Sequence, residues 1–298
     1  MYQKDAKNTG AISIKKTEFM VFGPLPSSPP VLLVYGHKVN LVDSFKYVGA
    51  VFGSTTRDIF LAHYQRKASK ARNVANATFA AEQMIGSLPP SEGVRLYMAR
   101  VDPHLTFGCE IMLDVDDKGI LLLERVQLNF LRRLLHVNRR SERCFLFTET
   151  GMMPIRARRV LLALGYLKYI LSLSPRTLAH TAFRHQITLT YHGYPCWLSD
   201  LRLVLARIRV PPALLANSSL FSCEGVDVVV QLVKDLTASQ LDMDLRASSK
   251  LWLLQQRVEF DSKGSPLPPT PHAFRHYLKA LTIPKHRKAY VHGEIEMG

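Results

Sequence analysis

Arginine is concentrated in one stretch of the sequence. Residues 125–159 contain nine arginines and no lysine, against two glutamates, Glu142 and Glu149. Because the planar guanidinium group can donate two parallel hydrogen bonds to one phosphate, this excess favours phosphate recognition. The alternative is that these arginines are solvated or paired within the protein. The candidate nucleic-acid contacts in this stretch are Arg125, Arg132, Arg133, Arg139, Arg140, Arg156 and Arg159.

A second basic group lies on a helix predicted over residues 59–84. Arg66, Lys67 and Lys70 recur at helical spacing and therefore lie on one side of it, with Arg72 close by. Such a row neutralises phosphates and releases their counterions. A solvated helix face without a ligand is the more common meaning of a charge run, and it stays open here.

Few residues could hold a metal ion. Asp114, Asp116 and Asp117 come directly before a helical pattern, where acids cap the helix and complement its dipole, so we prefer capping to metal binding. His272 and His276 have the spacing of two zinc ligands on a helix, but no third ligand or intervening glutamate accompanies them. We therefore predict no metal site in this chain.

The composition is that of a folded, strongly basic protein. Of 298 residues, 47% are hydrophobic, and 39 Lys and Arg outnumber 24 Asp and Glu to give a net charge of +15. Polyanions are the expected partners, nucleic acid before a membrane surface. The four cysteines include no C-x-x-C pair, which predicts neither a disulfide framework nor a zinc ribbon.

No membrane crossing is predicted. The longest apolar run, residues 160–173, is interrupted by Lys168 and is shorter than a bilayer span. The dispersed cysteines fit a reducing compartment. We therefore expect an intracellular location, cytoplasmic or nuclear.

The elements that position these residues are predicted to be mainly helical, with a small N-terminal antiparallel β meander (α+β). Apolar runs bounded by Gly and Pro between Lys15 and Phe52 read as strands, and residues 35–38 as a tight turn. So small a meander needs another layer over its apolar face. The predicted regions are the meander at 1–58, a helical region at 59–175, and a second helical region at 176–298 with a Pro-rich loop at 262–271.

The clearest helix is predicted at residues 118–136, where apolar residues recur every three or four positions. A helix beginning near Ser91 should kink at Pro103, which lacks a backbone donor. A helix from Thr150 to Leu173 is apolar nearly all round after Arg159 and should form the buried centre. Shorter helical stretches are expected near 178–183, 226–236 and 238–260.

Short motifs follow one another along the chain in a distinctive order. They are KKTEFMVFG (15–23), FKYVG (45–49), HYQRKASKAR (63–72), LY (96–97), VDP (101–103), GCE (108–110), LERVQ (123–127), FLRR (130–133), FTETG (147–151), PIR (154–156) and, more weakly, IPKHR (283–287). In this order they resemble the reverse transcriptase of non-LTR (LINE-type) retrotransposons, in the part that follows the catalytic aspartates. Each motif alone is weak.

The resemblance implies a palm remnant at 1–58, a thumb-like region at 59–175 and a post-thumb region at 176–298. Lys16 matches a lysine that assists the leaving pyrophosphate. Phe45, Tyr47 and Gly49 match the primer grip, a hairpin that presses on the primer backbone. The residues themselves also allow simpler interpretations: a solvent-facing lysine at a strand edge, and Phe45 and Tyr47 filling the core from one strand face.

The family's paired aspartates, which hold two metal ions, are expected before Lys15, and the sequence has none there. The chain therefore looks like a fragment of an RNA-directed DNA polymerase that is inactive alone, and Mg²⁺ is expected only for the complete polymerase. The expected retained function is nonspecific binding of RNA or an RNA/DNA hybrid. The alternatives are a non-binding helical remnant or interaction module of a decayed element, and a polymerase half completed in trans by an upstream palm fragment.

Overall fold

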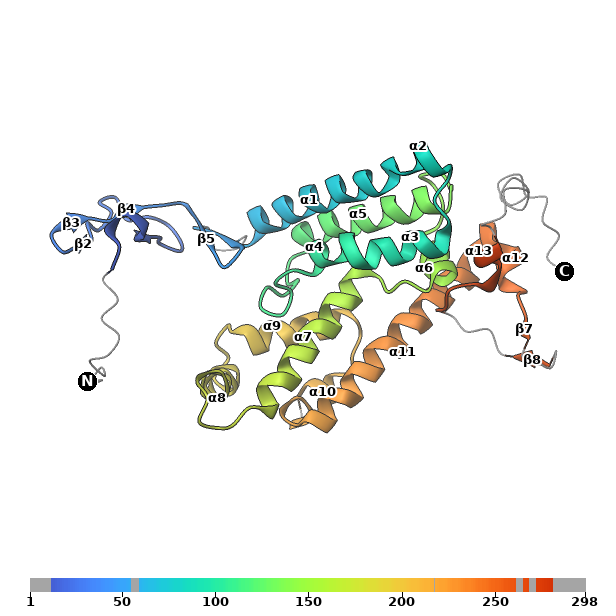
Figure 1. The fold of residues 1–298 in the computed structure, drawn as a ribbon. Coiled ribbons are helices and arrows are strands. Elements are labelled where there is room, and N and C mark those ends of the chain that lie inside the picture. The colour runs from blue at the N-terminus through green and yellow to red at the C-terminus, as the bar shows by residue number, and fades with distance from the viewer. Residues whose placement is uncertain (1–11, 55–58, 217, 261–264, 268–271, 281–298) are drawn as a thin grey trace. The chain divides into compact units, whose positions relative to one another are not determined.

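The computed structural model describes residues 12–54, 59–216, 218–260, 265–267 and 272–280 (Figure 1). The chain divides into two units, Met1–Gln65 and Arg66–Gly298, with the boundary inside helix α1. Most of the predicted Pro-rich loop at 262–271 and the motif at 283–287 lie outside the described residues.

The described part of the first unit contains short strands in separate pairs, preceded by a 3-10 turn at Ile14–Lys16. The pairs are β1 (Glu18–Phe19) with β4 (Asn40–Leu41), parallel; β2 (Leu33–Val34) with β3 (His37–Lys38), antiparallel; and β5 (Ser44–Tyr47) with β6 (Ala50–Gly53), antiparallel. The prediction of one continuous antiparallel meander is therefore wrong, although small N-terminal strands are confirmed. Strands of two residues carry little information about register or partner.

Both hairpin turns of the first unit use left-handed backbone. Tyr35 and Gly36 join β2 to β3 with φ of 50° and 78°, and Val48 and Gly49 join β5 to β6 with φ of 48° and 87°. Two consecutive residues with positive φ match the twist of antiparallel strands. The predicted turn near Tyr35 is thus confirmed, and Gly49 lies in a turn that favours glycine.

The second unit begins with helices that lie side by side (Figure 1). They are α1 (Leu61–Ala80), the short α2 (Glu82–Ile85), α3 (Pro90–Leu96), α4 (Asp102–Thr106) and α5 (Asp117–Leu134). Tilted aromatic rings pack between them: the centroid of the Phe130 ring of α5 lies 4.8 Å from that of Phe79 of α1 and 5.0 Å from that of Tyr97, which follows α3. These rings form the centre of this layer.

Pro103 is accommodated by a change of helix type. A π-helical turn, Tyr97–Val101, connects α3 to α4, and the Asp102 N–H donates to the carbonyl of Tyr97, five residues back. Proline cannot donate and its ring crowds the preceding turn, so a wider turn before it relieves the clash. The predicted disruption at Pro103 is confirmed, in the form of this π turn.

Helix α5 has the predicted amphipathic pattern. Asp116 caps it, since its side chain accepts a 2.9 Å hydrogen bond from the Lys118 N–H. The predicted capping role is confirmed for this residue. The apolar face is buried along its whole length, from Ile120 to Leu134, and the cationic residues are left on the other face.

Helix α7 (Ile155–Ser172) and the following elements complete the described part of the second unit. They are α6 (Arg143–Thr150), α8 (Leu178–Tyr191), α9 (Trp197–Arg207), α10 (Pro212–Ala216), a 3-10 turn (Ser218–Phe221), α11 (Cys223–Ala247), a 3-10 turn (Ser249–Leu251), α12 (Trp252–Gln255), the antiparallel pair β7 (Glu259–Phe260) and β8 (Pro266–Leu267), and α13 (His276–Ala280). Helix α7 packs against α5, α8, α9 and α11. Its predicted central position is confirmed, and the 59–175 and 176–298 regions share one core.

The C-terminal segment that includes α13 is attached through Glu149, near the end of α6. This carboxylate is fully buried and accepts hydrogen bonds from Arg257 Nη1, at 2.6 Å, and from the hydroxyl of Tyr277. The Arg275 N–H donates to the Glu149 carbonyl, at 3.0 Å. Gly151 follows at φ 63°, where an added Cβ would lie 2.4 Å from the backbone nitrogen of Phe274. Only glycine permits this close approach.

Candidate nucleic-acid interface

A groove of about 210 Å³ lies between α1 and α5. Three arginines line it, Arg72 from α1 and Arg125 and Arg133 from α5, together with the amides of Asn76 and Asn129. Apolar residues complete the lining: Ala75, Phe79, Val126 and Phe130. Five side chains that can donate hydrogen bonds thus surround one concave surface.

Helical spacing explains this convergence. Arg72 and Asn76 are four residues apart on α1, and Arg125, Asn129 and Arg133 repeat the interval on α5, so each set forms one stripe along its helix. The Phe79 and Phe130 rings pack below and hold the two stripes beside each other. The four-residue intervals in the sequence predict a polar stripe on each helix. They do not predict that α1 and α5 pack side by side, because that depends on residues far apart in the chain.

The groove is cationic. No described lining residue is acidic, and α1 contains no Asp or Glu. Glu82, just after α1, lies 3.1 Å from Arg133, whose guanidinium also lies 4.3 Å above the Phe79 ring. Arg72 and Arg125 are exposed and form no ion pair within the described part of the chain. They remain available to an anionic ligand.

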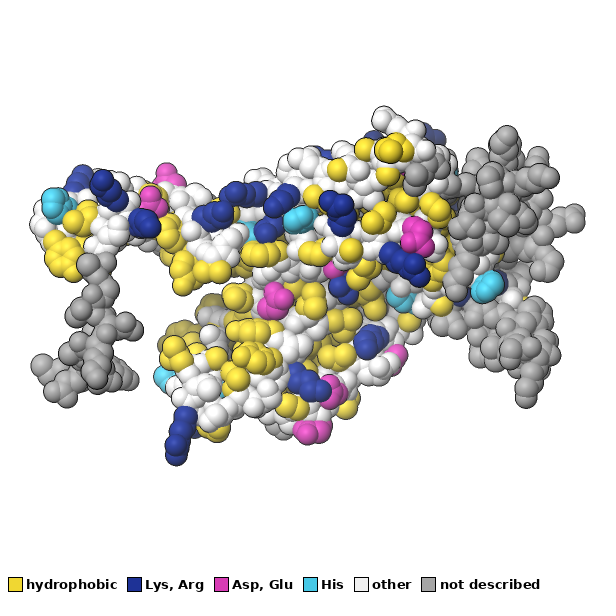
Figure 2. All heavy atoms as spheres, in the orientation of Figure 1, with side chains coloured by type: hydrophobic (Ala, Val, Ile, Leu, Met, Phe, Trp, Pro, Cys, Tyr) yellow, Lys and Arg dark blue, Asp and Glu magenta, His cyan; other side chains and the backbone are white. Residues whose placement is uncertain are grey.

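The predicted row on α1 lies on its other flank. Lys67 Nζ lies 3.2 Å from the centre of the Phe107 ring, which follows α4. Burial, then the charges of Lys70 and Lys67, lower the pKa of His104 in α4. Arg66 and Lys70 are exposed, and Lys and Arg side chains gather over α1 in Figure 2. Helix α1 therefore carries positive charge on both sides, and the contact of Lys67 with Phe107 was not predicted.

The loop between α5 and α6 carries Arg139 and Arg140, both exposed. Arg132, in the last turn of α5, is partly buried, and its Nη2 donates to the Ser141 carbonyl at 3.4 Å. Because Arg132 and Arg133 are adjacent in the chain, the last turn of α5 connects this loop to the groove. The predicted residues Arg125, Arg132, Arg133, Arg139 and Arg140 thus follow α5 into the loop after it.

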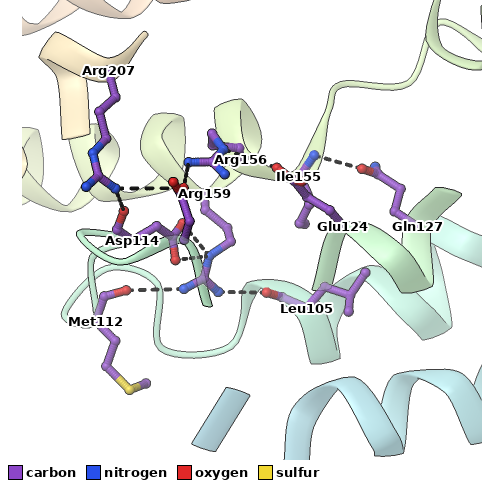
Figure 3. Close-up of polar contacts among 10 residues, drawn as sticks. Leu105, Met112, Asp114, Glu124, Gln127, Ile155, Arg156, Arg159 and Arg207 are labelled. Carbon is purple, nitrogen blue, oxygen red and sulfur yellow. Dashed lines mark hydrogen bonds and ion pairs between the residues drawn. The ribbon is translucent and has the colours of Figure 1, made fainter. Parts of the chain in front are cut away.

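Arg159 is not part of this surface. It is buried, its Nε lies 2.9 Å from Asp114 Oδ2, and its Nη1 donates to the Leu105 carbonyl at 2.7 Å (Figure 3). A second carbonyl, that of Met112, accepts from Nη2 at 3.2 Å. An enclosed guanidinium that is bound on three sides cannot reach a phosphate. The prediction that Arg159 contacts nucleic acid is therefore corrected.

Arg156 is likewise occupied within the protein. Its Nε lies 3.1 Å from Glu124 of α5 (Figure 3). Its Nη1 lies 2.8 Å from Asp117, so two carboxylates pair with it. Its neighbour Arg158 donates two 2.7 Å hydrogen bonds to Asp102, which raise the pKa of Arg158. The contact of Arg156 with nucleic acid stays a prediction, and this group of arginines attaches α7 to its neighbours.

The primer-grip-like residues lie in the first unit. Phe45 is half-buried and Tyr47 is 64% exposed. Both line an aromatic pocket of about 330 Å³ with Phe19, Phe22 and Phe52, among others. Tyr47 thus does not fill a closed core. Lys16 is exposed at the end of the 3-10 turn before β1.

Comparison with family models, curated proteins and solved structures found no match for this chain. In the described ranges, no group of three or more His, Cys, Asp or Glu side chains is placed to hold a metal ion. None of the described helices combines the length and the apolar character of a membrane span.

Proposed function

We propose that this protein binds RNA or an RNA/DNA hybrid through the phosphate backbone, without sequence preference, using the cationic surface of α1 and α5. The observation that carries the proposal is the convergence of Arg72, Arg125 and Arg133 on one groove from two helices. Guanidinium groups bind phosphate well, because each guanidinium can donate parallel hydrogen bonds to two phosphate oxygens.

The dimensions of the groove suit a strand. Arg125 and Arg133 are eight residues apart, roughly 12 Å along a helix that rises 1.5 Å per residue. At about 3.4 Å per nucleotide of a stacked strand, that interval spans about three to four nucleotides. The groove is small, so it accommodates backbone groups and leaves bases outside.

The lack of sequence preference follows from what lies in the groove. Base stacking needs an accessible aromatic face, and the Phe79 and Phe130 rings are each only 2% exposed. The remaining polar groups, Asn76 and Asn129, suit ribose hydroxyls and phosphates, which carry no sequence information.

The direct test is the salt dependence of RNA binding by a triple variant, Arg72→Gln, Arg125→Gln and Arg133→Gln. For wild type, affinity should fall steeply as salt rises. The triple variant should bind about tenfold or more weakly at low salt, with a slope of log K against log salt reduced by about two, because single strands release roughly 0.7 counterions per contact.

A matched triple variant controls for net charge. Arg176, Arg184 and Lys234 are exposed and form no ion pair within the described residues, so their replacement by Gln removes the same charge elsewhere. This control should retain most of the affinity of wild type. Equal losses in both triple variants would show that charge acts without a site. Absence of RNA binding by folded wild type would favour the non-binding helical module.

We also infer a second candidate function, a polymerase half completed in trans. The first unit supports it because large apolar side chains stand exposed on it: Tyr35 at 70%, Val48 at 79% and, in the lining of the aromatic pocket, Tyr47 at 64%. Exposed apolar surface of this kind suits a protein partner. Primer extension with Mg²⁺, with and without a separately purified upstream palm fragment, tests it. Failure of the mixture to extend a primer that the protein binds would reject this candidate and leave RNA binding standing.

A further inference from the structure

Three arginines come together where α5 ends and α6 begins. Arg132 Nη2 donates to the Ser141 carbonyl at 3.4 Å, and Ser141 lies two residues from both Arg139 and Arg143. Burial and then the charges of Arg143 and Arg139 also lower the pKa of Arg132. Like charges that perturb one another are close in space. One arginine each from the last turn of α5, the connecting loop and the first residue of α6 therefore form a cationic cluster.

These guanidinium groups have donors to spare. The Nε atom of Arg132 is buried and has no hydrogen-bond partner, and its Nη2 makes only the long 3.4 Å contact with the Ser141 carbonyl. No hydrogen bond of the Arg132 Nη1 atom occurs within the described residues, so this guanidinium keeps donors for a ligand. Arg139 and Arg143 are exposed and form no ion pair within the part of the chain that the structure describes.

The acid adjacent to the cluster in sequence is paired with another residue. Glu142 lies in the loop directly before Arg143, and its carboxylate lies 3.0 Å from Lys250 Nζ, which already balances it. As the N-cap of α6, Glu142 supplies no side-chain hydrogen bond to the first turn. The positive end of the α6 dipole thus adds to the charge of the three arginines.

The loop itself is held in shape by its own hydrogen bonds. Asn138 Oδ1 accepts from the Arg140 N–H at 2.7 Å, and the Asn138 carbonyl accepts from the N–H and the hydroxyl of Ser141. This local turn fixes the backbone on both sides of Arg139. A preorganised loop loses less entropy when it binds a ligand.

We propose that Arg132, Arg139 and Arg143 form a phosphate-monoester site, which holds the terminal phosphate of a bound nucleic-acid strand. A monoester carries close to two negative charges at neutral pH and presents three strong acceptor oxygens, whereas an internal phosphodiester carries one charge. Three guanidiniums that form no ion pair with any described residue match the monoester better. This inference rests on the proposed RNA binding and adds to it a preference for one kind of strand end.

The test compares oligonucleotides of one sequence that carry a 5′-phosphate, a 3′-phosphate or hydroxyls at both ends, in chloride buffer at constant ionic strength. We expect one phosphorylated form to bind about tenfold more tightly than the hydroxyl form, since one further charge-assisted interaction changes affinity by about that factor. The double variant Arg139→Gln, Arg143→Gln should bind all three oligonucleotides equally, whatever part of the affinity for the hydroxyl form it loses. The control Arg176→Gln, Arg184→Gln should keep the preference.

Inorganic phosphate distinguishes a free anion from a strand end. It should raise the unfolding temperature of wild type above that in chloride of equal ionic strength, and the double variant should lack this rise. Equal binding of all three oligonucleotides would overturn the inference, and so would a preference that survives in the double variant. If no oligonucleotide binds but phosphate still stabilises wild type alone, the anion site stands and the RNA proposal fails. No specific effect of phosphate in either assay would overturn the site.

Discussion

Arg159 and Asp114 form an ion pair in the interior of the helical unit, with Arg159 Nε 2.9 Å from Asp114 Oδ2 and side-chain exposures of only 4% and 3%. The pair connects α7 to the segment that precedes α5. Two backbone carbonyls accept from the same guanidinium, so the buried charge is surrounded by acceptors. Arg159 is therefore a structural arginine, unlike the exposed arginines that can bind a ligand.

Replacement of Arg159 by leucine should strongly destabilise the protein. It leaves the Asp114 carboxylate buried without its partner, which costs about 3–5 kcal/mol in comparable cases. Urea unfolding measures the change. The same replacement at exposed Arg184 should change the free energy of unfolding by no more than about 0.5 kcal/mol. The double variant Arg159→Leu, Asp114→Leu should recover part of the loss, and a loss below about 1 kcal/mol for Arg159→Leu would contradict the buried pair.

Glu82→Gln should increase RNA affinity. Glu82 lies 3.1 Å from Arg133 and competes with phosphate for that guanidinium, whereas glutamine keeps the oxygen that accepts from the Leu88 N–H. We expect a gain of about two- to fivefold at low salt, because partly exposed pairs contribute less than about 1 kcal/mol. Filter binding measures it. Glu92→Gln, which removes an acid paired with Arg95 outside the groove, should have a smaller effect, and an equal gain from both variants would indicate net charge alone.

Glu149→Gln should loosen the C-terminal segment. The buried carboxylate accepts from Arg257 and Tyr277, and its neutralisation leaves a buried guanidinium without a counter-charge, at a cost of about 3–5 kcal/mol. Hydrogen exchange at residues 275–278 should accelerate more than exchange in α5. Glu142→Gln, which breaks only the exposed pair with Lys250, should cost less than about 1 kcal/mol. Unchanged exchange at 275–278 would rule out this attachment.

Stability should fall in alkaline solution partly because of Cys109. Burial raises the pKa of its thiol from 9.0 to about 12. Between these values the unfolded chain loses the proton and the folded chain keeps it, so stability is full below pH 9 and declines as pH rises towards 12, by up to about 1.4 kcal/mol per pH unit. Lysines and tyrosines also titrate here, so the measurement is the difference between wild type and Cys109→Val. Parallel pH profiles for the two proteins would contradict the assignment.

Patterns within one element predicted that element well. The repeat of Ile120, Leu123 and Val126 identified α5, and Asp116 directly before it identified the cap, because both depend on residues within a few positions of each other. The apolar composition after Arg159 likewise predicted the buried position of α7. Each of these signals lies within one helix.

Partners distant in sequence could not be predicted in the same way. Arg159 and Asp114 are 45 residues apart, and Arg158 and Asp102 are 56 apart. An arginine that binds a buried carboxylate looks the same in the sequence as one that binds phosphate. The excess of arginine in residues 125–159 therefore has two origins: arginines paired within the protein and arginines exposed on its surface. Only the fold shows that Arg156 and Arg159 belong to the first group and Arg125 and Arg133 to the second.

The strands of the first unit show a further limit. The parallel pairing of β1 with β4 involves two residues on each side, too few for alternation to determine a partner. The turn at Tyr35 and Gly36 was predictable because its residue types have strong local preferences.

The attachment of residues 275–277 to Glu149 affects how shortened versions of the chain must be designed. A truncation that stops before Tyr277 removes the hydroxyl that donates to the buried Glu149 carboxylate and leaves Arg257 as its partner, so one oxygen of a carboxylate without access to water loses its donor. Deletion mapping from the C-terminal end would then report misfolding as loss of RNA retention. A recombinant helical half therefore needs a downstream limit beyond Ala280.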